Sequence, residues 1–234
     1  MTKLTPRLSA IATEINMGET MADIGTDHGF LPLYLWKEGI CPKVIMADIS
    51  RGSLQKAEDN CKEAFPQESF DLRLGNGIEV LKPAEVDVLV IAGMGGILMT
   101  EILGNDIRKA RSYKKIILQP RTHVGLLRYW LYNNGFSIIN EQLVREGKFI
   151  CEILTVIPRE VAVTKDLGGD SIEYEFPLKL VDFKGPLTEE YLRGKLDMEK
   201  NILASMEKGK NPAFEELRKQ RYRIEYLERL VERL

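Results

Sequence analysis

The sequence predicts an α/β fold in which helices cover both faces of a largely parallel, seven-stranded sheet, followed by a C-terminal α-helical coiled-coil hairpin. From Met21 to about Pro158, short apolar runs alternate with amphipathic or glycine-started segments, which is typical of repeated strand–helix units. The runs Val88–Ala92 and Ile116–Leu118 are aliphatic throughout, as expected of central strands that are buried on both sides. Near the C-terminus the apolar spacing changes to that of paired helices.

Each strand and helix of the first block follows from this alternation. The predicted strands are residues 21–25, 43–49, 71–74, 86–92, 114–119, 137–144 and 149–157, and the predicted helices between them are residues 30–37, 52–64, 97–103 and 124–134. Only a short segment that includes Glu146, Gly147 and Lys148 separates the last two strands, so these strands must form an antiparallel hairpin.

The flanking segments complete the predicted organisation. Apolar residues recur at helical spacing from Leu4 to Ile15, which predicts an amphipathic leading helix over the sheet edge. Residues 159–185 have no clean period and are predicted to form an irregular linker. Residues 186–234 are predicted to form the helical hairpin, with a stop and restart at residues 209–212. Residues 1–158 are predicted to be the ligand-binding domain.

Composition and charge exclude several classes of protein. With 44% hydrophobic residues and a net charge of −2, the 234-residue chain is neither disordered nor a polycation. No long apolar run or signal-peptide core is present, so we expect a cytoplasmic protein that binds no membrane. Cys41, Cys61 and Cys151 lack CxxC spacing, so we expect no disulfide and no metal site. We also expect a monomer, with weak dimerisation as the alternative.

The turn Asp23-Ile-Gly-Thr-Asp-His-Gly29 follows the first strand of the sheet and precedes a helix. Ligands of open α/β sheets bind at the carboxyl ends of the strands, where glycines let the backbone approach them. Counted from Gly25, the G-x-G-x-x-G dinucleotide pattern falls on Asp27 and Phe30, so we expect no NAD binding. The spacing instead resembles the acidic-x-Gly-x-Gly-x-Gly turn of class I S-adenosylmethionine-dependent methyltransferases, with Asp27 replacing the middle glycine.

The next two strand ends carry further candidate cofactor residues. Asp48 closes the second strand, where a carboxylate can accept hydrogen bonds from both ribose hydroxyls, and Ile49 follows it. The alternative for Asp48 is a cap for the following helix. Asn76 and Gly77 follow the third strand, where an amide can reach the adenine edge; the alternative for Asn76 is a turn residue with an unusual backbone angle. The complete set of candidate cofactor residues is Asp23, Gly25, His28, Gly29, Asp48, Ile49, Asn76, Gly77 and Gly93.

Together with these turns, the stretches Ile91-Ala-Gly-Met-Gly-Gly96, Leu118-Gln-Pro120 and Leu4-Thr-Pro-Arg-Leu8 resemble the bacterial tRNA (adenine-22-N1)-methyltransferase family over essentially the whole chain. The resemblance implies a class I methyltransferase Rossmann-like fold, S-adenosylmethionine as cofactor bound by residues 1–158, and tRNA as substrate. The chain departs from the family pattern at Asn76, where an acidic residue is expected, and at Arg121, where asparagine is frequent.

The fourth-strand turn, Gly93-Met-Gly-Gly96, lacks the Asn/Asp-Pro-Pro-aromatic motif of enzymes that methylate exocyclic amines, which favours a ring nitrogen such as adenine N1. Asp27 is the catalytic candidate for stabilising the charge that develops on the ring; its alternative is a helix cap. Arg7 is a second candidate, binding a phosphate or the base, against a plain surface arginine. Met94 is the third.

The remaining expectations concern RNA binding. Lys109, Arg111, Lys114 and Lys115 form a short basic cluster that we place near the substrate side, with a solvated surface as the alternative. The hairpin is expected to help hold RNA without building the active site. Two alternatives stay open: a methyltransferase acting on another nucleobase, a protein or a small molecule, and a non-catalytic scaffold that binds the cofactor.

Overall fold

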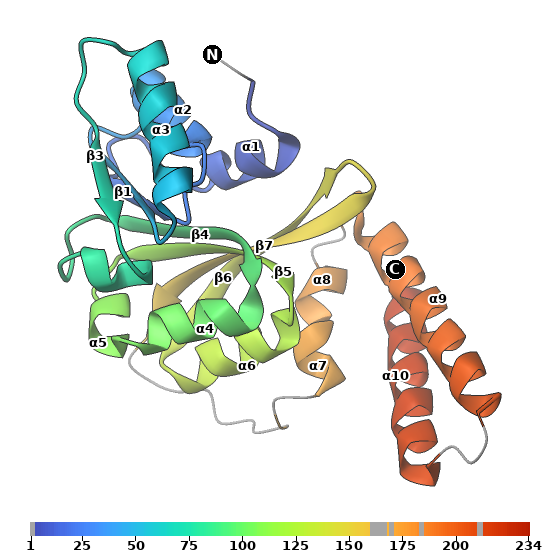
Figure 1. Ribbon diagram of the computed structural model, residues 1–234. Helices are drawn as coiled ribbons and strands as arrows, with labels where there is room; N and C mark the ends of the chain where they lie inside the picture. The colour runs from blue at the N-terminus through green and yellow to red at the C-terminus, as the bar shows by residue number, and fades with distance from the viewer. Residues whose placement is uncertain (1–2, 160–167, 169–170, 183–184, 210–212) are drawn as a thin grey trace.

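The sheet is mixed and has seven strands in the order β3-β2-β1-β4-β5-β7-β6 (Figure 1). The computed structural model describes residues 3–159, 168, 171–182, 185–209 and 213–234. The strands are β1 (Met21–Ile24), β2 (Val44–Asp48), β3 (Asp71–Leu74), β4 (Val88–Gly95), β5 (Lys115–Thr122), β6 (Phe136–Glu146) and β7 (Phe149–Pro158). Strand β7 runs antiparallel to β5 and β6, whereas the other pairs are parallel. The predicted strand number and terminal hairpin are confirmed.

Helices cover both faces because successive strand residues point to two different apolar layers. Ala22 and Ile24 of β1 belong to one buried cluster, and Met21 belongs to the other. The first layer contains η1 (Gly77–Val80), α4 (Gly96–Gly104), α5 (Ile107–Ala110) and α6 (Val124–Asn133), and the second contains α1 (Pro6–Thr13), α2 (Phe30–Lys37) and α3 (Arg51–Ala64). The leading helix α1 packs against β6, β7 and α2.

Strand β4 is longer than the sequence predicts. The prediction ended the strand at Ala92, but β4 continues to Gly95 beside β5, with shifts of register on both sides of Met94. Gly93 adopts φ 78°, which bends the backbone at this bulge. The extension forms because β5 itself continues to Thr122 and supplies pairing partners. The glycine-rich segment is therefore the bulged end of a strand.

The irregular linker predicted over residues 159–185 is wrong in its local structure. It contains two short helices, α7 (Ile172–Glu175) and α8 (Leu178–Asp182). Ile172, Phe176 and Leu180 are buried in one apolar cluster with the C-terminal hairpin. Helices of four and five residues are too short to produce a readable apolar period in the sequence. Gly169 and Asp170, which suggested a loop, lie outside the described residues.

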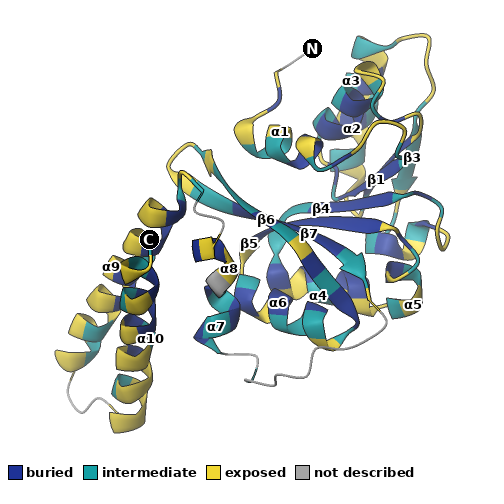
Figure 2. Cartoon of the chain, turned by 180° about the vertical axis from the view of Figure 1, so that it is seen from behind, coloured by how far each residue is buried: buried dark blue, intermediate teal, exposed yellow. Residues whose placement is uncertain are grey.

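The predicted C-terminal hairpin is present as α9 (Thr188–Glu207) and α10 (Phe214–Glu232), which lie side by side. Leu192, Leu196, Ile224 and Leu227 are buried between and beneath them, while the outward faces are exposed (Figure 2). Residues 210–212 of the predicted restart lie outside the described residues. Within the described part of the chain, no helix has the length and apolar character needed to cross a membrane.

Candidate functional site

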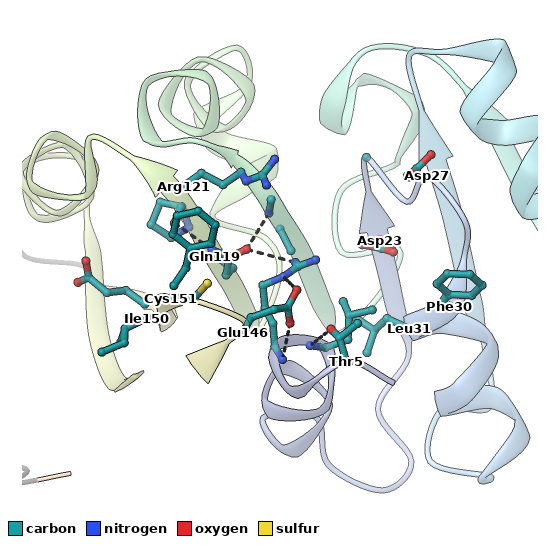
Figure 3. A pocket seen from close by; sticks show the side chains of 18 of the residues that line it. Thr5, Asp23, Asp27, Phe30, Leu31, Gln119, Arg121, Glu146, Ile150 and Cys151 are labelled. Atoms are coloured by element: carbon teal, nitrogen blue, oxygen red, sulfur yellow. Dashed lines mark hydrogen bonds and ion pairs between the residues drawn. The ribbon is translucent and has the colours of Figure 1, made fainter. Parts of the chain in front are cut away.

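A cavity of about 690 Å³ lies at the carboxyl ends of β1, β4 and β5 (Figure 3). Its walls come from six parts of the chain: the turn after β1, the end of β4, the end of β5, the start of α1, the tip of the β6–β7 hairpin, and α9. Six of the predicted site residues line it, namely Arg7, Asp23, Gly25, Asp27, His28 and Gly93. The topology therefore brings together the turn after β1 and the glycine-rich end of β4.

The turn after β1 has a backbone that few residues tolerate. Gly25 adopts φ 77°, and a Cβ atom built on it would lie 2.0 Å from the terminal methyl carbon of Met94. Asp27 adopts φ 46°, a left-handed conformation that aspartate accepts more readily than most side chains. Asp27 thus takes a left-handed backbone conformation, which glycine adopts freely. Met94 packs beneath Gly25 and is not among the residues that line the cavity.

Asp23 places a buried carboxyl in the cavity wall. The residue is 7% exposed, and the Thr26 hydroxyl donates a hydrogen bond to its Oδ2 over 2.8 Å. Burial raises the pKa of Asp23 to about 6, although the Thr26 hydrogen bond and the positive charge of Arg7 both act to lower it. A cationic group bound in the cavity could form an ion pair with this buried carboxylate.

The Asp27 side chain points outward beside this carboxyl and is 53% exposed. Its Oδ1 lies 3.1 Å from Lys56 Nζ, and its Oδ2 lies 3.5 Å from His28 Nε2. Helix α2 begins after Gly29 and has no side-chain cap, so the alternative that Asp27 caps this helix is wrong. Lys56 on α3 and His28 instead hold the carboxylate at the cavity edge. The His28 ring also stacks on Phe30, with centroids 5.1 Å apart.

Arg7 ties the leading helix to two other walls of the cavity. Its Nε donates to Glu146 Oε1 over 3.2 Å, and its Nη1 donates to Gln119 Oε1 over 3.2 Å. The same Gln119 oxygen accepts the backbone N–H of Gly93 over 3.1 Å. Burial alone would raise the pKa of Glu146, but hydrogen bonds from Thr5 and Arg7 lower it overall. The alternative that Arg7 is a plain surface arginine is therefore wrong.

The sequence analysis did not single out Gln119 and Glu146 as site residues. Gln119 is 2% exposed, so its amide must find partners inside the protein. A glutamine directly after the aliphatic run Ile116–Leu118 is the signal that could have indicated it, because buried strands seldom carry an amide. Glu146 gave no comparable signal, since acidic residues are common at hairpin tips.

The predicted residues after β2 form an open ledge beside the cavity. Asp48 Oδ2 accepts the N–H of Asp27 over 3.3 Å, and Oδ1 accepts the N–H of Ser50 over 2.8 Å. Helix α3 is capped by the Ser50 hydroxyl, which accepts the N–H of Ser53, so the alternative that Asp48 caps this helix is wrong. Ile49 is 70% exposed beside it. The ledge offers a carboxylate and an apolar side chain to a ligand.

The ledge continues at the end of β3. Asn76 has ordinary extended angles, φ −90° and ψ 111°, so the alternative that it adopts an unusual turn conformation is wrong. Gly77 supplies the positive φ of 54° at this point. The Asn76 side chain is exposed and its amide lies 3.5 Å from Glu79 Oε1. The remaining predicted residue, Gly29, is buried against Met46 and Ala57, where it supports the turn.

The basic cluster at residues 109–115 is not on the substrate side. Lys114 Nζ lies 2.6 Å from Asp87 Oδ1, and Lys115 Nζ lies 2.8 Å from Glu19 Oε2. These residues precede or begin β5, so they lie at the amino-terminal end of that strand, whereas the cavity lies at its carboxyl end. The predicted placement of this cluster was wrong because the charge run alone does not show whether it lies at the amino or the carboxyl end of a strand. Among the described residues, no group of three or more His, Cys, Asp or Glu side chains could hold a metal ion.

The hairpin contributes to the cavity, contrary to the expectation that it leaves the active site alone. Tyr191 and Lys195 of α9 both line the cavity. The Tyr191 hydroxyl donates to Glu152 Oε1 over 2.6 Å, and Glu152 also pairs with Arg128, which is completely buried. Arg128 further binds Glu141 over 3.0 Å and the backbone carbonyls of Tyr174 and Glu175. The sequence showed a heptad pattern here but not which helical face meets the sheet.

Comparison with known proteins extends these observations. A family model described as a methyltransferase domain matches residues 4–154. The tRNA (adenine(22)-N(1))-methyltransferase of Bacillus subtilis is 35% identical over 152 residues, which are 65% of this chain and 64% of that protein. The match therefore spans just under two thirds of the length of the B. subtilis enzyme.

Solved structures share the fold over nearly the full length. The B. subtilis m1A22 tRNA methyltransferase TrmK is 27% identical with a TM-score of 0.86, covering 99% of this chain and 100% of that chain. A putative tRNA (m1A22) methyltransferase of Streptococcus pneumoniae, in complex with S-adenosyl-L-methionine, is 25% identical with a TM-score of 0.83, covering 98% and 100%. The predicted Rossmann-like fold is confirmed. The chain therefore belongs to the class I methyltransferases and, among them, to the bacterial tRNA (adenine-22-N1)-methyltransferase family.

Proposed function

We propose that this chain is an enzyme that transfers a methyl group from S-adenosylmethionine to N1 of an adenine in tRNA, at position 22. The observation that carries the proposal is the cavity beside Asp23 and Asp27, which lies next to the open ledge at Asp48. A cofactor on the ledge and a base in the cavity would meet at the turn after β1. The names of the relatives, which specify this reaction, support the same conclusion.

The residues present suit this cofactor. The positive φ of Gly25 and its missing Cβ let a ligand approach the backbone, and the buried Asp23 carboxyl can accept the cofactor's ammonium group. Each Asp48 oxygen already accepts one N–H group and retains a lone pair for a ribose hydroxyl. The exposed Ile49 and the Asn76 amide suit the face and the edge of adenine. When bound, S-adenosylmethionine supplies an electrophilic methyl group on a positively charged sulfur.

The chain's own residues would chiefly position the base. Adenine N1 already carries an in-plane lone pair, so no residue has to remove a proton from it, and correct placement supplies most of the rate. Asp27, held by Lys56, lies where its negative charge can stabilise the positive charge that develops on the ring. Arg7 and Gln119 fix the Gly93 bulge that forms the floor of the base site.

A methyl-transfer assay tests the substrate class. The purified protein is incubated with labelled S-adenosylmethionine and, separately, unmodified tRNA, bulk rRNA and a protein lysate. We expect label in tRNA alone, with the modified nucleotide mapped by primer extension. Label in rRNA or in protein would show that the methyl acceptor is not tRNA. If no acceptor is labelled, the result favours a non-catalytic scaffold that binds the cofactor. The proposed substrate places the enzyme in the cytoplasm, and we propose that it acts as a monomer, which light scattering checks.

The ribose contact has its own test. Asp48→Ala is expected to weaken S-adenosylmethionine binding by about 1–3 kcal/mol, because a charged acceptor of two hydrogen bonds is lost. Asp59→Ala is the matched control, since Asp59 is exposed on α3 and bonds only to Gln55 among the described residues. Calorimetry measures both. Equal affinities for the two variants would remove Asp48 from the binding site.

A further inference from the structure

A second, smaller cavity of about 330 Å³ adjoins the first. Pro120, Arg121, Glu152 and Lys195 line both cavities, so the two spaces lie side by side and share a wall. The second cavity lies between the segment that joins β5 to α6 and the inner side of α9. Nothing in the proposed chemistry of base and cofactor occupies it. When a base of an RNA strand enters the first cavity, the second cavity offers space for the neighbouring nucleotide.

The acidic residues of the second cavity are already neutralised by protein cations. Glu152 pairs with the buried Arg128 and accepts the hydroxyl of Tyr191. Glu175 lies 2.7 Å from Arg223 of α10. Their negative charge is therefore largely cancelled by these partners, and it does little to repel an anion.

In the part of the chain that the structure describes, two cations in the shared wall form no side-chain hydrogen bond or ion pair. The Arg121 side chain is exposed and makes no hydrogen bond or ion pair with another described residue. Lys195 is half-buried, and its ammonium lies 5.4 Å from the ring centroid of Tyr191 and 5.9 Å from that of Phe176. Contact with aromatic faces holds a cation in place without cancelling its charge. Both charges are thus available to an anionic ligand.

We propose that Arg121 and Lys195 together bind a backbone phosphate of the tRNA strand, next to the nucleotide whose base enters the first cavity. This proposal rests on the proposed function. Arg121 brings a planar group that can donate two hydrogen bonds to a phosphate, and Lys195 adds a compact charge. Because Arg121 lies on β5 and Lys195 on α9, the phosphate would join the sheet to the hairpin. The contact positions the strand and reads no base.

The salt dependence of tRNA binding tests this site. We compare wild type, Arg121→Gln, Lys195→Gln and the double variant, using a tRNA transcript that the wild type methylates. The double variant is expected to bind about tenfold more weakly, with a slope of log affinity against log salt that is shallower by about 1. Its S-adenosylmethionine affinity should stay unchanged. Lys195→Arg, which keeps the charge, should retain the wild-type slope.

Two exposed cations far from both cavities provide matched controls. The control substitutions are Lys37→Gln, at the end of α2, and Arg108→Gln, on α5. Combined in one protein, they change the net charge by as much as the double variant does. They are expected to leave the salt slope and the KM for tRNA at wild-type values. If the controls lower the slope as much as the double variant does, the effect belongs to net charge and the phosphate site is overturned.

A neutral linkage in the RNA identifies the phosphate itself. A transcript with a methylphosphonate beside the target adenosine should bind the wild type about tenfold more weakly, yet bind the double variant no more weakly than ordinary tRNA does. Equal losses for the two proteins would overturn the assignment. If the wild type methylates tRNA and the double variant keeps its slope, only the phosphate site fails. If the wild type transfers no methyl group to tRNA, the proposed function fails and the phosphate site falls with it.

Discussion

Replacing Tyr191 by phenylalanine tests how the hairpin is fixed to the sheet. The substitution removes one oxygen and leaves the ring, which is 6% exposed, in its apolar surroundings. The lost interaction is the 2.6 Å hydrogen bond to the Glu152 carboxylate. Hydrogen bonds to charged groups contribute about 1.5–3 kcal/mol, and Glu152 keeps its pairing with Arg128, so no carboxylate is left without a partner. We therefore expect the unfolding free energy to fall by about 2 kcal/mol.

Urea denaturation followed by circular dichroism at pH 7 measures this change. Tyr222→Phe is the matched control, because its hydroxyl also donates to a carboxylate, Glu173, over 2.7 Å, but the residue is 45% exposed. Water replaces the lost partner there, so the control should change stability by about 0.5 kcal/mol or less. Equal losses for the two variants would refute the reasoning that burial makes the Tyr191 bond important.

Three further predictions concern the turn after β1. Burial raises the pKa of Asp23 from 3.8 to about 6, so the folded state holds this proton more tightly than the unfolded state does. As the pH rises from about 4 to about 6, the cofactor-free chain should therefore lose about 3 kcal/mol of unfolding free energy. An equal loss over the same pH range in Asp23→Asn would contradict this assignment. Gly25→Ala should cost more stability in urea than Gly18→Ala, because both glycines have positive φ but only Gly25 faces a neighbour, Met94; equal costs would show that this contact is harmless. Asp27→Asn should lower kcat by more than about tenfold while S-adenosylmethionine affinity changes less than about twofold, and equal losses in kinetics and calorimetry would indicate a structural role.

The sheet could be predicted because its information is local. Aliphatic runs such as Val88–Ala92 are typical of strands covered on both faces, and the two residues between β6 and β7 permit only an antiparallel connection. The turn after β1 was equally readable, since its positive-φ positions restrict the residue types. These features depend on the backbone of a few neighbouring residues.

The rest of the site depends on contacts between distant segments. Glu146 acquires its role because α1 packs on the β6–β7 tip, a separation of 139 residues along the chain. Lys195 lies in a helix whose apolar spacing would be the same whichever face met the sheet. The sequence also does not decide which residue caps α3, since both Asp48 and Ser50 are suitable residue types. The structure shows that the Ser50 hydroxyl is the cap.

The buried arginine Arg128 limits how such enzymes can be recombined. It joins α6, the two antiparallel strands and, through Glu152 and Tyr191, the hairpin. A chimera whose hairpin carried no hydroxyl at the Tyr191 position would lose the hydrogen bond to Glu152 on β7, while Glu152 kept its pairing with Arg128. A hydrogen bond to a buried charged group contributes about 1.5–3 kcal/mol, a substantial part of the stability of a single domain. Functional exchanges should therefore place the crossover before Arg128, so that the arginine, both glutamates and the tyrosine are inherited as one set.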